Sequence, residues 1–305
     1  MEAFLIEDDA ISQKVYLYNQ PTKPKAVIHL VHGLFDYAQR YHKVAKYFED
    51  AGFIVVVHDL PGHGELQVEP GLIDFEGMHT LVQSVYAVKQ FINRKYVSIK
   101  HILIAHQLGS MIAQILMQKE RNLYDQVFLL APNSTSKTQM NYWRLIGRVI
   151  SVFKPRVAPS NFLSYHTLDK PYRMMRKNGI VNEKHEWLTS DKDIQKAYLT
   201  DPKIGLAISL RAHLAVLALY AEAKRYSRLK KQASSMPLHF FCGDQDAYSD
   251  YGNYVKKLYA IYYKKGFTNL HYSVYQDARH ELLNEVQRYK ICDDIIHYIQ
   301  KKLFK

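Results

Sequence analysis

His101-Ile-Leu-Ile-Ala-His-Gln-Leu-Gly-Ser-Met-Ile-Ala-Gln-Ile-Leu-Met117 is the stretch that decides the fold. Residues 101–105 are a short apolar run typical of a buried strand, and residues 111–117 are an apolar run typical of a buried helix. Between them, Gln107 stands at the apex of a sharp turn, and Gly109 follows two residues later. We therefore predict a strand, a tight turn and a helix, with Gln107 at the apex.

The flanking sequence repeats this alternation of strand and helix. Short β-branched or apolar runs predict strands at 26–31, 53–57, 126–131, 237–242 and 270–275, and an edge strand at 11–20. Amphipathic spacing predicts helices at 41–51, 75–93, 252–265 and 285–302. Strands separated by helices indicate an α/β protein with a mostly parallel sheet and helices on both faces.

The alternation stops between about 134 and 235. This region is mostly helical, with expected helices at 142–153 and around 205–223. We predict one α/β core domain built from 1–133 plus 236–305, with a helical cap of 134–235 inserted into it.

Composition places the chain among ordinary globular proteins. Its 305 residues are 48% hydrophobic and 23% charged, so it can bury a large core. The two cysteines, Cys242 and Cys292, form neither a disulfide framework nor a metal-binding spacing. The N-terminal ten residues lack the basic segment of a signal peptide, and the longest apolar stretch, 212–221, is too short to span a bilayer. We expect a cytoplasmic protein.

The net charge of +12 favours anionic surfaces. No zinc-finger, helix-turn-helix or RNA-binding signature accompanies the basic residues, so we expect no nucleic-acid partner. A lysine-rich composition without functional meaning is the plainer explanation of the charge. The alternative is peripheral contact with an anionic membrane.

Three polar residues follow predicted strands at their carboxyl ends, where open α/β sheets place their ligands. They are Gln107, Asp246 and His280. A histidine at such a place can accept a proton from a nucleophile and return it to the leaving group. An aspartate can hold the imidazole in the required tautomer. The order of nucleophile position, acid and histidine is that of the hydrolases built on a G-x-S-x-G turn.

At this point the chain resembles the monoacylglycerol lipase and lysophospholipase branch of the α/β hydrolases, which is often labelled serine aminopeptidase-like. The matching stretches are His32-Gly33 with Arg40-Tyr41, Asp59-Leu-Pro-Gly-His-Gly-Glu65, His106-x-x-Gly109-Ser110, Gly243-Asp-Gln-Asp246 and Ala278-Arg-His-Glu-Leu-Leu-Asn-Glu285. The resemblance implies an α/β-hydrolase fold, Asp246 as acid and His280 as base. It also implies an oxyanion hole made by the backbone N–H groups of Leu34 and Leu108.

The departures from the family pattern gather at the implied site. They are Gln107 in place of the serine, Ala105 and Phe35 in place of glycines, and Leu66 in place of a serine. A carboxamide is not a nucleophile, and Ser110 belongs to the following helix. We expect a member that has lost catalysis and binds a lipid-like ligand or, if the pocket is filled, a protein partner. The alternative is an ester hydrolase in which His280 activates a water. No cofactor or metal is expected.

The segment Tyr142–Phe153 admits two interpretations. Its apolar residues form a stripe, with Arg144, Arg148 and Lys154 beside it. The plainer interpretation is a cap helix packed on the core. The other is a basic amphipathic lip that touches anionic lipid and admits an acyl chain.

Overall fold

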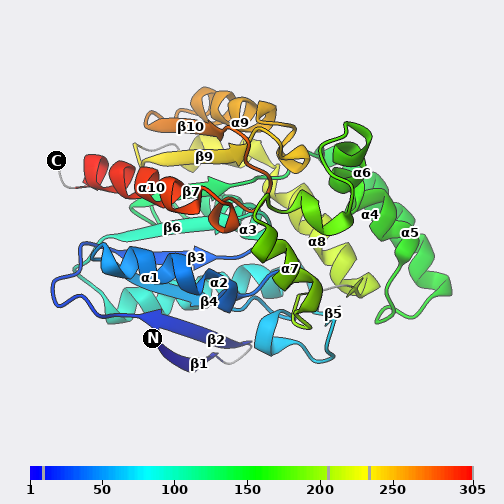
Figure 1. Ribbon diagram of the computed structural model, residues 1–305, viewed down its shortest axis with the longest axis horizontal. Coiled ribbons are helices and arrows are strands. Elements are labelled where there is room, and N and C mark those ends of the chain that lie inside the picture. Colours follow the sequence, from blue (N-terminus) through cyan, green and yellow to red (C-terminus); the bar gives the residue numbers. More distant parts are fainter. Residues whose placement is uncertain (9–10, 205–206, 233–234, 304–305) are drawn as a thin grey trace.

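An eight-stranded sheet with helices on both faces forms the body of the molecule (Figure 1). The structure is a computed structural model that describes residues 1–8, 11–204, 207–232 and 235–303. The strand order is β1-β2-β4-β3-β6-β7-β9-β10. The strands are β1 Glu2–Asp8, β2 Ile11–Tyr18, β3 Val27–Val31, β4 Ile54–His58, β6 His101–His106, β7 Gln126–Leu130, β9 Leu238–Gly243 and β10 Leu270–Tyr275.

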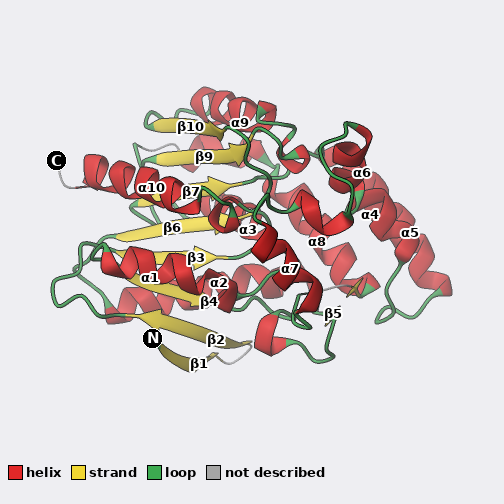
Figure 2. Ribbon diagram, in the orientation of Figure 1, coloured by secondary structure: helices red, strands yellow, loops and turns green. Residues whose placement is uncertain are grey.

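Six of these strands run parallel, from β4 through β3, β6, β7 and β9 to β10, whereas β2 is antiparallel to both β4 and β1. The mostly parallel sheet is what the alternation in the sequence predicts, and the whole is the α/β-hydrolase fold that the resemblance implies. The parallel strands read as continuous apolar runs because both faces of the sheet are covered. Figure 2 shows the strands as one layer with helices in front of and behind it.

The two faces of the sheet bury different helices. On one face α1 His42–Asp50 and α10 Arg288–Leu303 pack on side chains such as Ile28, Ile104 and Phe128. On the other face α2 Gly77–Lys95, α3 Leu108–Lys119 and α9 Asn253–Lys264 pack on side chains such as Leu103 and Leu129. The sheet is thus the middle layer of three.

Within the described residues, five α-helices lie between β7 and β9 in the chain. They are α4 Lys137–Phe153, α5 Asn161–Thr167, α6 Lys170–Lys177, α7 Lys192–Thr200 and α8 Leu210–Ala223. In Figure 1 they gather beyond the carboxyl ends of the parallel strands. Helix α8 shares a hydrophobic cluster with α2 and α3. The division into a 1–133 plus 236–305 core and a 134–235 cap stays a prediction.

Three expectations about the elements were wrong. Strand β2 is not the edge, because β1, which we did not predict, pairs outside it and packs Phe4 and Ile6 onto the sheet. The helix expected around 205–223 begins only at Leu210. Residues 205–206 lie outside the described residues, and Ala207–Ile208 form a short strand, β8, paired with β5 Leu72–Ile73. The last helix begins at Arg288 rather than at Glu285, whose carboxylate accepts hydrogen bonds from the N–H groups of Ser190 and Arg279.

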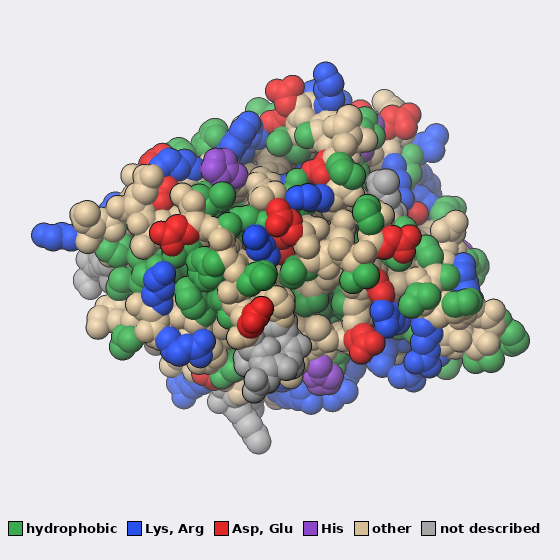
Figure 3. Space-filling model, turned by 90° about the horizontal axis from the view of Figure 1, so that it is seen from below, with side chains coloured by type: hydrophobic (Ala, Val, Ile, Leu, Met, Phe, Trp, Pro, Cys, Tyr) green, Lys and Arg blue, Asp and Glu red, His purple; other side chains and the backbone are tan. Residues whose placement is uncertain are grey.

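Charges of both signs occur on the face of the molecule that Figure 3 shows. On the face shown in Figure 3, Lys and Arg side chains are interspersed with Asp and Glu side chains. Over the described ranges, no helix has the length and apolar character that a membrane crossing requires.

Candidate active site

The predicted turn lies between β6 and α3. Gln107 has φ 47° and ψ −102°, a conformation that residues other than glycine seldom adopt. Gly109 allows the turn to sit against the end of β3, because a Cβ at this position would lie 2.6 Å from the carbonyl oxygen of Val31. The turn is therefore compressed between neighbouring strands, and backbone strain of this kind concentrates at functional sites.

The side chain of Gln107 is turned inward and is only 5% exposed. Its Oε1 accepts hydrogen bonds from the backbone N–H groups of Leu34, at 2.5 Å, and of Leu108, at 2.7 Å. Its Nε2 donates to the hydroxyls of Tyr220 and Tyr248, at 3.2 and 3.1 Å. Two N–H donors require an oxygen opposite them, so this network fixes the orientation of the carboxamide.

The N–H of Leu34 is held in place by the loop that follows β3. His32 Nε2 accepts from the Leu60 N–H at 2.9 Å, so Nδ1 carries the proton and donates to the carbonyl of Gly33 at 2.7 Å. Burial lowers the pKa of His32 to about 4, which keeps the ring neutral and this pattern intact. At Gly33 the loop approaches Gln107 so closely that a Cβ there would lie 3.0 Å from Oε1.

His280 and Asp246 form the hydrogen bond that the sequence predicts. Nδ1 of His280 lies 3.1 Å from Oδ1 of Asp246, and both side chains are buried. Burial alone would raise the pKa of Asp246, but the adjacent His280 and hydrogen bonds, among them one from the Tyr248 N–H, lower it below its usual value. Trp187 stacks on the imidazole with ring centroids 4.6 Å apart. Asp246 is thus an ionised carboxylate, and the His280–Asp246 pair is shielded from solvent.

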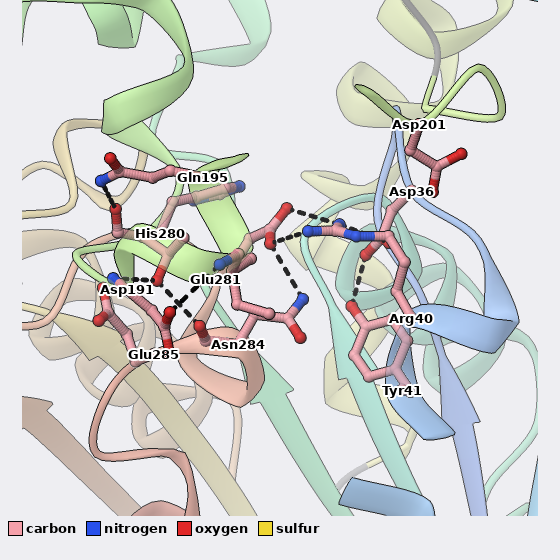
Figure 4. Close-up of polar contacts among 12 residues, drawn as sticks. Asp36, Arg40, Tyr41, Asp191, Gln195, Asp201, His280, Glu281, Asn284 and Glu285 are labelled. Atoms are coloured by element: carbon pink, nitrogen blue, oxygen red, sulfur yellow. Dashed lines mark hydrogen bonds and ion pairs between the residues drawn. The ribbon is translucent and has the colours of Figure 1, made fainter. Parts of the chain in front are cut away.

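The residue after His280 is anchored by a buried arginine (Figure 4). Arg40 donates to both oxygens of Glu281, at 3.0 and 2.7 Å, and to Asp36 at 2.7 Å. Tyr41 donates to the other oxygen of Asp36, and Asn284 donates to Glu281. These bonds tie the loop after β10 to the segment after β3.

The same loop is bonded to the segment between α6 and α7. The Glu281 N–H donates to the carbonyl of Leu188, and Glu285 accepts from the N–H of Ser190 and of Arg279. Arg279 donates in turn to backbone carbonyls in this segment. His280 is therefore clamped from two sides.

A cavity of about 350 Å³ opens beside these groups. Both Gln107 and His280 line it, so the sequence-predicted positions meet at one place. Its wall is completed by apolar side chains, among them Leu34, Phe35, Leu168, Trp187, Leu199 and Ile208, and by polar ones, among them Asp169, Glu183, Lys184 and His185. Within the described ranges, no group of three or more His, Cys, Asp and Glu residues is arranged to hold a metal.

The sequence did not reveal several residues of this site. Tyr220, Tyr248 and Trp187 contact Gln107 or His280 but lie in no recognisable motif. Arg40 was part of a motif, but its partner Glu281 is 241 residues away, and one sequence alone carries no signal for such a pair.

Comparison with known proteins decides the family. The profile of the family described as "Serine aminopeptidase, S33" matches residues 22–287, which is most of the chain. The chain belongs to the serine aminopeptidase S33 family. A monoglyceride lipase homologue of monkeypox virus is 30% identical over 160 residues, 51% of this chain and 55% of its own length. Human monoglyceride lipase is 26% identical over 147 residues, 46% of this chain and 47% of its own.

The aligned region thus spans about half the length of these two relatives of the S33 family. Among solved structures, a thermostable carboxyl esterase from Bacillus coagulans in complex with glycerol superposes with a TM-score of 0.86 at 21% identity. The match covers 99% of this chain and 98% of the esterase. At that identity the likeness concerns the fold, which agrees with the family assignment.

Proposed function

We propose that this chain is a member of the S33 family without hydrolytic activity that uses its pocket to bind a lipid-like ligand. In this proposal Gln107 stands at the position of the nucleophilic serine, Asp246 at that of the acid and His280 at that of the base. A carboxamide cannot form an acyl-enzyme. Tight binding without turnover is the remaining use of the pocket.

The observation that carries the proposal is the place of the Gln107 oxygen. It accepts both backbone N–H groups, of Leu34 and Leu108, that would polarise a substrate carbonyl. Each such donor contributes roughly 3–4 kcal/mol to an active hydrolase. While Oε1 holds them, a bound ester gains none of this stabilisation. Activity is therefore blocked twice, by the missing nucleophile and by the occupied hole.

The size and lining of the pocket favour binding of a small apolar ligand over a role limited to contact with a protein partner. Its volume, about 350 Å³, lies within the range of roughly 300–1,000 Å³ that ligand pockets span. Phe35 lies in the wall of the pocket and leaves it open. The printed names of the curated relatives, monoglyceride lipases, support a glycerolipid or a related acyl compound as the ligand.

Calorimetric titration with monoalkylglycerol ethers of increasing chain length tests ligand binding, because an ether cannot be hydrolysed. We expect Leu199→Glu, in the pocket wall, to weaken binding by about tenfold or more, since it replaces apolar contact with charge. Val68→Glu is the matched control, because Val68 is 89% exposed and lies outside the pocket wall. Absence of binding by the wild type at every chain length, or equal loss in both variants, would contradict the proposal.

An active hydrolase is the second candidate, and the intact His280–Asp246 hydrogen bond favours it. In this candidate His280 acts as general base on a water, and Gln107 orients that water as glutamine does in some GTPases. The Gln107 oxygen would first have to leave Leu34 and Leu108. Removal of a triad member leaves only a small residual rate, so the expected activity is low.

Peripheral contact with an anionic membrane is a further part of the proposal. Along α4, Leu145, Val149, Val152 and Phe153 are 55–85% exposed, and Arg144 and Arg148 lie on the same helix. Apolar side chains flanked by arginines suit the boundary of an anionic bilayer. Sedimentation with vesicles should show binding to phosphatidylglycerol-containing but not pure phosphatidylcholine membranes, and Phe153→Asp should reduce it. Equal binding to both vesicles would contradict this part.

A further inference from the structure

We propose that Gln107 is a self-modification site: its side-chain amide is hydrolysed in place by a water that His280 activates, which converts residue 107 to glutamate and releases ammonia. This inference concerns the protein's own side chain and needs no ligand in the pocket. It goes beyond the proposed function, and the two can fail separately.

The carboxamide of Gln107 is held as a hydrolase holds the carbonyl it attacks. Its oxygen accepts from two backbone N–H groups, at 2.5 and 2.7 Å, in a buried setting. Donors so placed stabilise the negative charge that develops on oxygen when a nucleophile adds to the carbonyl carbon. The electrophile in this site is therefore a residue of the chain itself.

Tyr248 places the general base next to this amide. Its hydroxyl accepts from Gln107 Nε2, and its ring lies 4.8 Å from the His280 ring, centroid to centroid. Asp246 occupies Nδ1 of His280 and leaves Nε2 as the nitrogen available to a water. The cavity that Gln107 and His280 line is far larger than the roughly 10–15 Å³ that one water needs.

The reaction consumes only water. His280 takes a proton as the water oxygen bonds to Cδ of Gln107, and the carbonyl electrons move onto Oε1 in the hole. The Cδ–Nε2 bond then breaks while His280 returns its proton to Nε2, which leaves as ammonia. The product acid ionises, so one amide and one water give one carboxylate and one ammonium ion, and His280 is restored.

Two other glutamines on α3 serve as internal controls. The Nε2 of Gln114 donates to Ser110, and the Nε2 of Gln118 donates to Ala223. Within the described residues, the Oε1 of each is buried with no hydrogen-bond donor. Their carbonyls are therefore not polarised, and in the part of the chain that the structure describes neither side chain is bonded to a paired histidine and aspartate. Residue 107 should be hydrolysed selectively.

The test is a time course of the purified full-length protein in ¹⁸O-labelled water, followed by trypsin cleavage and fragmentation mass spectrometry. One peptide, residues 101–119, contains Gln107, Gln114 and Gln118. We expect a heavy-oxygen glutamate to accumulate at position 107 and not at the other two. The Gln107→Glu protein supplies the reference peptide.

His280→Ala should slow the conversion by about 100-fold, because a general base contributes at least that factor. Circular dichroism and thermal unfolding establish that this variant is folded. Added imidazole should restore the conversion, which a merely misfolded variant would not show. No conversion in the wild type, equal conversion of Gln114 and Gln118, or an undiminished rate in folded His280→Ala would overturn the inference. Ester hydrolysis, measured separately, decides the proposed function.

Discussion

The guanidinium of Arg40 holds both carboxylate oxygens of Glu281, 241 residues further along the chain, at 3.0 and 2.7 Å. Both side chains are buried, and Arg40 also binds Asp36. The carboxylates of Asp36 and Glu281 hold the pKa of Arg40 above its usual value despite burial, which by itself would lower it. Since Glu281 directly follows His280, this pair sets the position of the imidazole.

Arg40→Met should therefore destabilise the protein strongly. It leaves two buried carboxylates without their partner, which typically costs about 3–5 kcal/mol in the free energy of unfolding. Lys100→Met is the matched control, because the Lys100–Asp125 pair is solvent-exposed and should contribute less than about 1 kcal/mol. Urea unfolding measures both. If the free energy of unfolding decreases no more for Arg40→Met than for Lys100→Met, the Arg40–Glu281 pair does not anchor the loop.

Gly243→Ala should separate the two loops that carry Asp246 and His280. Gly243 ends β9, and a Cβ there would collide with the backbone carbonyl of Ala278. Gly179→Ala is a suitable control, because Gly179 has φ +71° but nothing within 4 Å, so only the backbone strain of roughly 1–2 kcal/mol applies. The unfolding temperature should fall clearly further for Gly243→Ala than for Gly179→Ala. Similar decreases would mean that the close approach of Gly243 to Ala278 does not contribute to stability.

Replacement of Gln107 should reveal what its oxygen does for stability. Gln107→Leu removes the acceptor for the Leu34 and Leu108 N–H groups, and each unsatisfied buried donor costs about 1–3 kcal/mol. Gln107→Glu keeps an acceptor there and should cost less. Denaturant unfolding of the two variants checks this order. If leucine is tolerated as well as glutamate, the two hydrogen bonds contribute little.

Stability should fall on acidification below about pH 6.5. Among the described residues, burial lowers the pKa of seven histidines: to about 3 for His58, His63 and His213, to about 4 for His32 and His106, and also below the usual value for His29 and His101. Between these values and 6.5 the unfolded chain binds protons that the folded protein does not. The stabilisation is therefore complete above pH 6.5 and is lost as the pH falls, by up to about 1.4 kcal/mol per pH unit and group.

Asp59 and Asp244 oppose this trend, because burial raises the pKa of both carboxyls, to about 6 for Asp59, but the seven histidines outnumber them. Urea unfolding between pH 7.5 and 4.5 measures the slope, and His213→Gln, which removes one titrating ring, should make it shallower by one group's share. A free energy of unfolding that is constant or rises toward low pH would contradict the account.

The sequence was sufficient to predict the parallel strands of the sheet, because the central ones are buried on both faces and read as apolar runs bounded by turns. The turn at Gln107 and the proximity of Asp246 to His280 were also predictable. All three residues follow parallel strands, and the carboxyl ends of these strands lie at the same edge of the sheet. Strand β1 was not predicted, because Glu2–Asp8 mixes acidic and apolar residues. It is a strand only through its pairing with β2.

The orientation of the Gln107 side chain was not predictable. It depends on Tyr220 and Tyr248, which come from distant helical and loop segments with no local signal. The exposed stripe of α4 was visible as a pattern, but whether it packs inward depended on its neighbours. The structure buries only Met140 and Gly147 of that helix.

Hydrolysis of short- and long-chain p-nitrophenyl esters and of a lysophospholipid by the wild type, His280→Ala and Gln107→Ser tests the central claim most directly. The account predicts no turnover by the wild type and measurable turnover by freshly prepared Gln107→Ser, in which the hole is free and a nucleophile is present. Turnover by the wild type that disappears in His280→Ala would contradict it and establish the water mechanism instead.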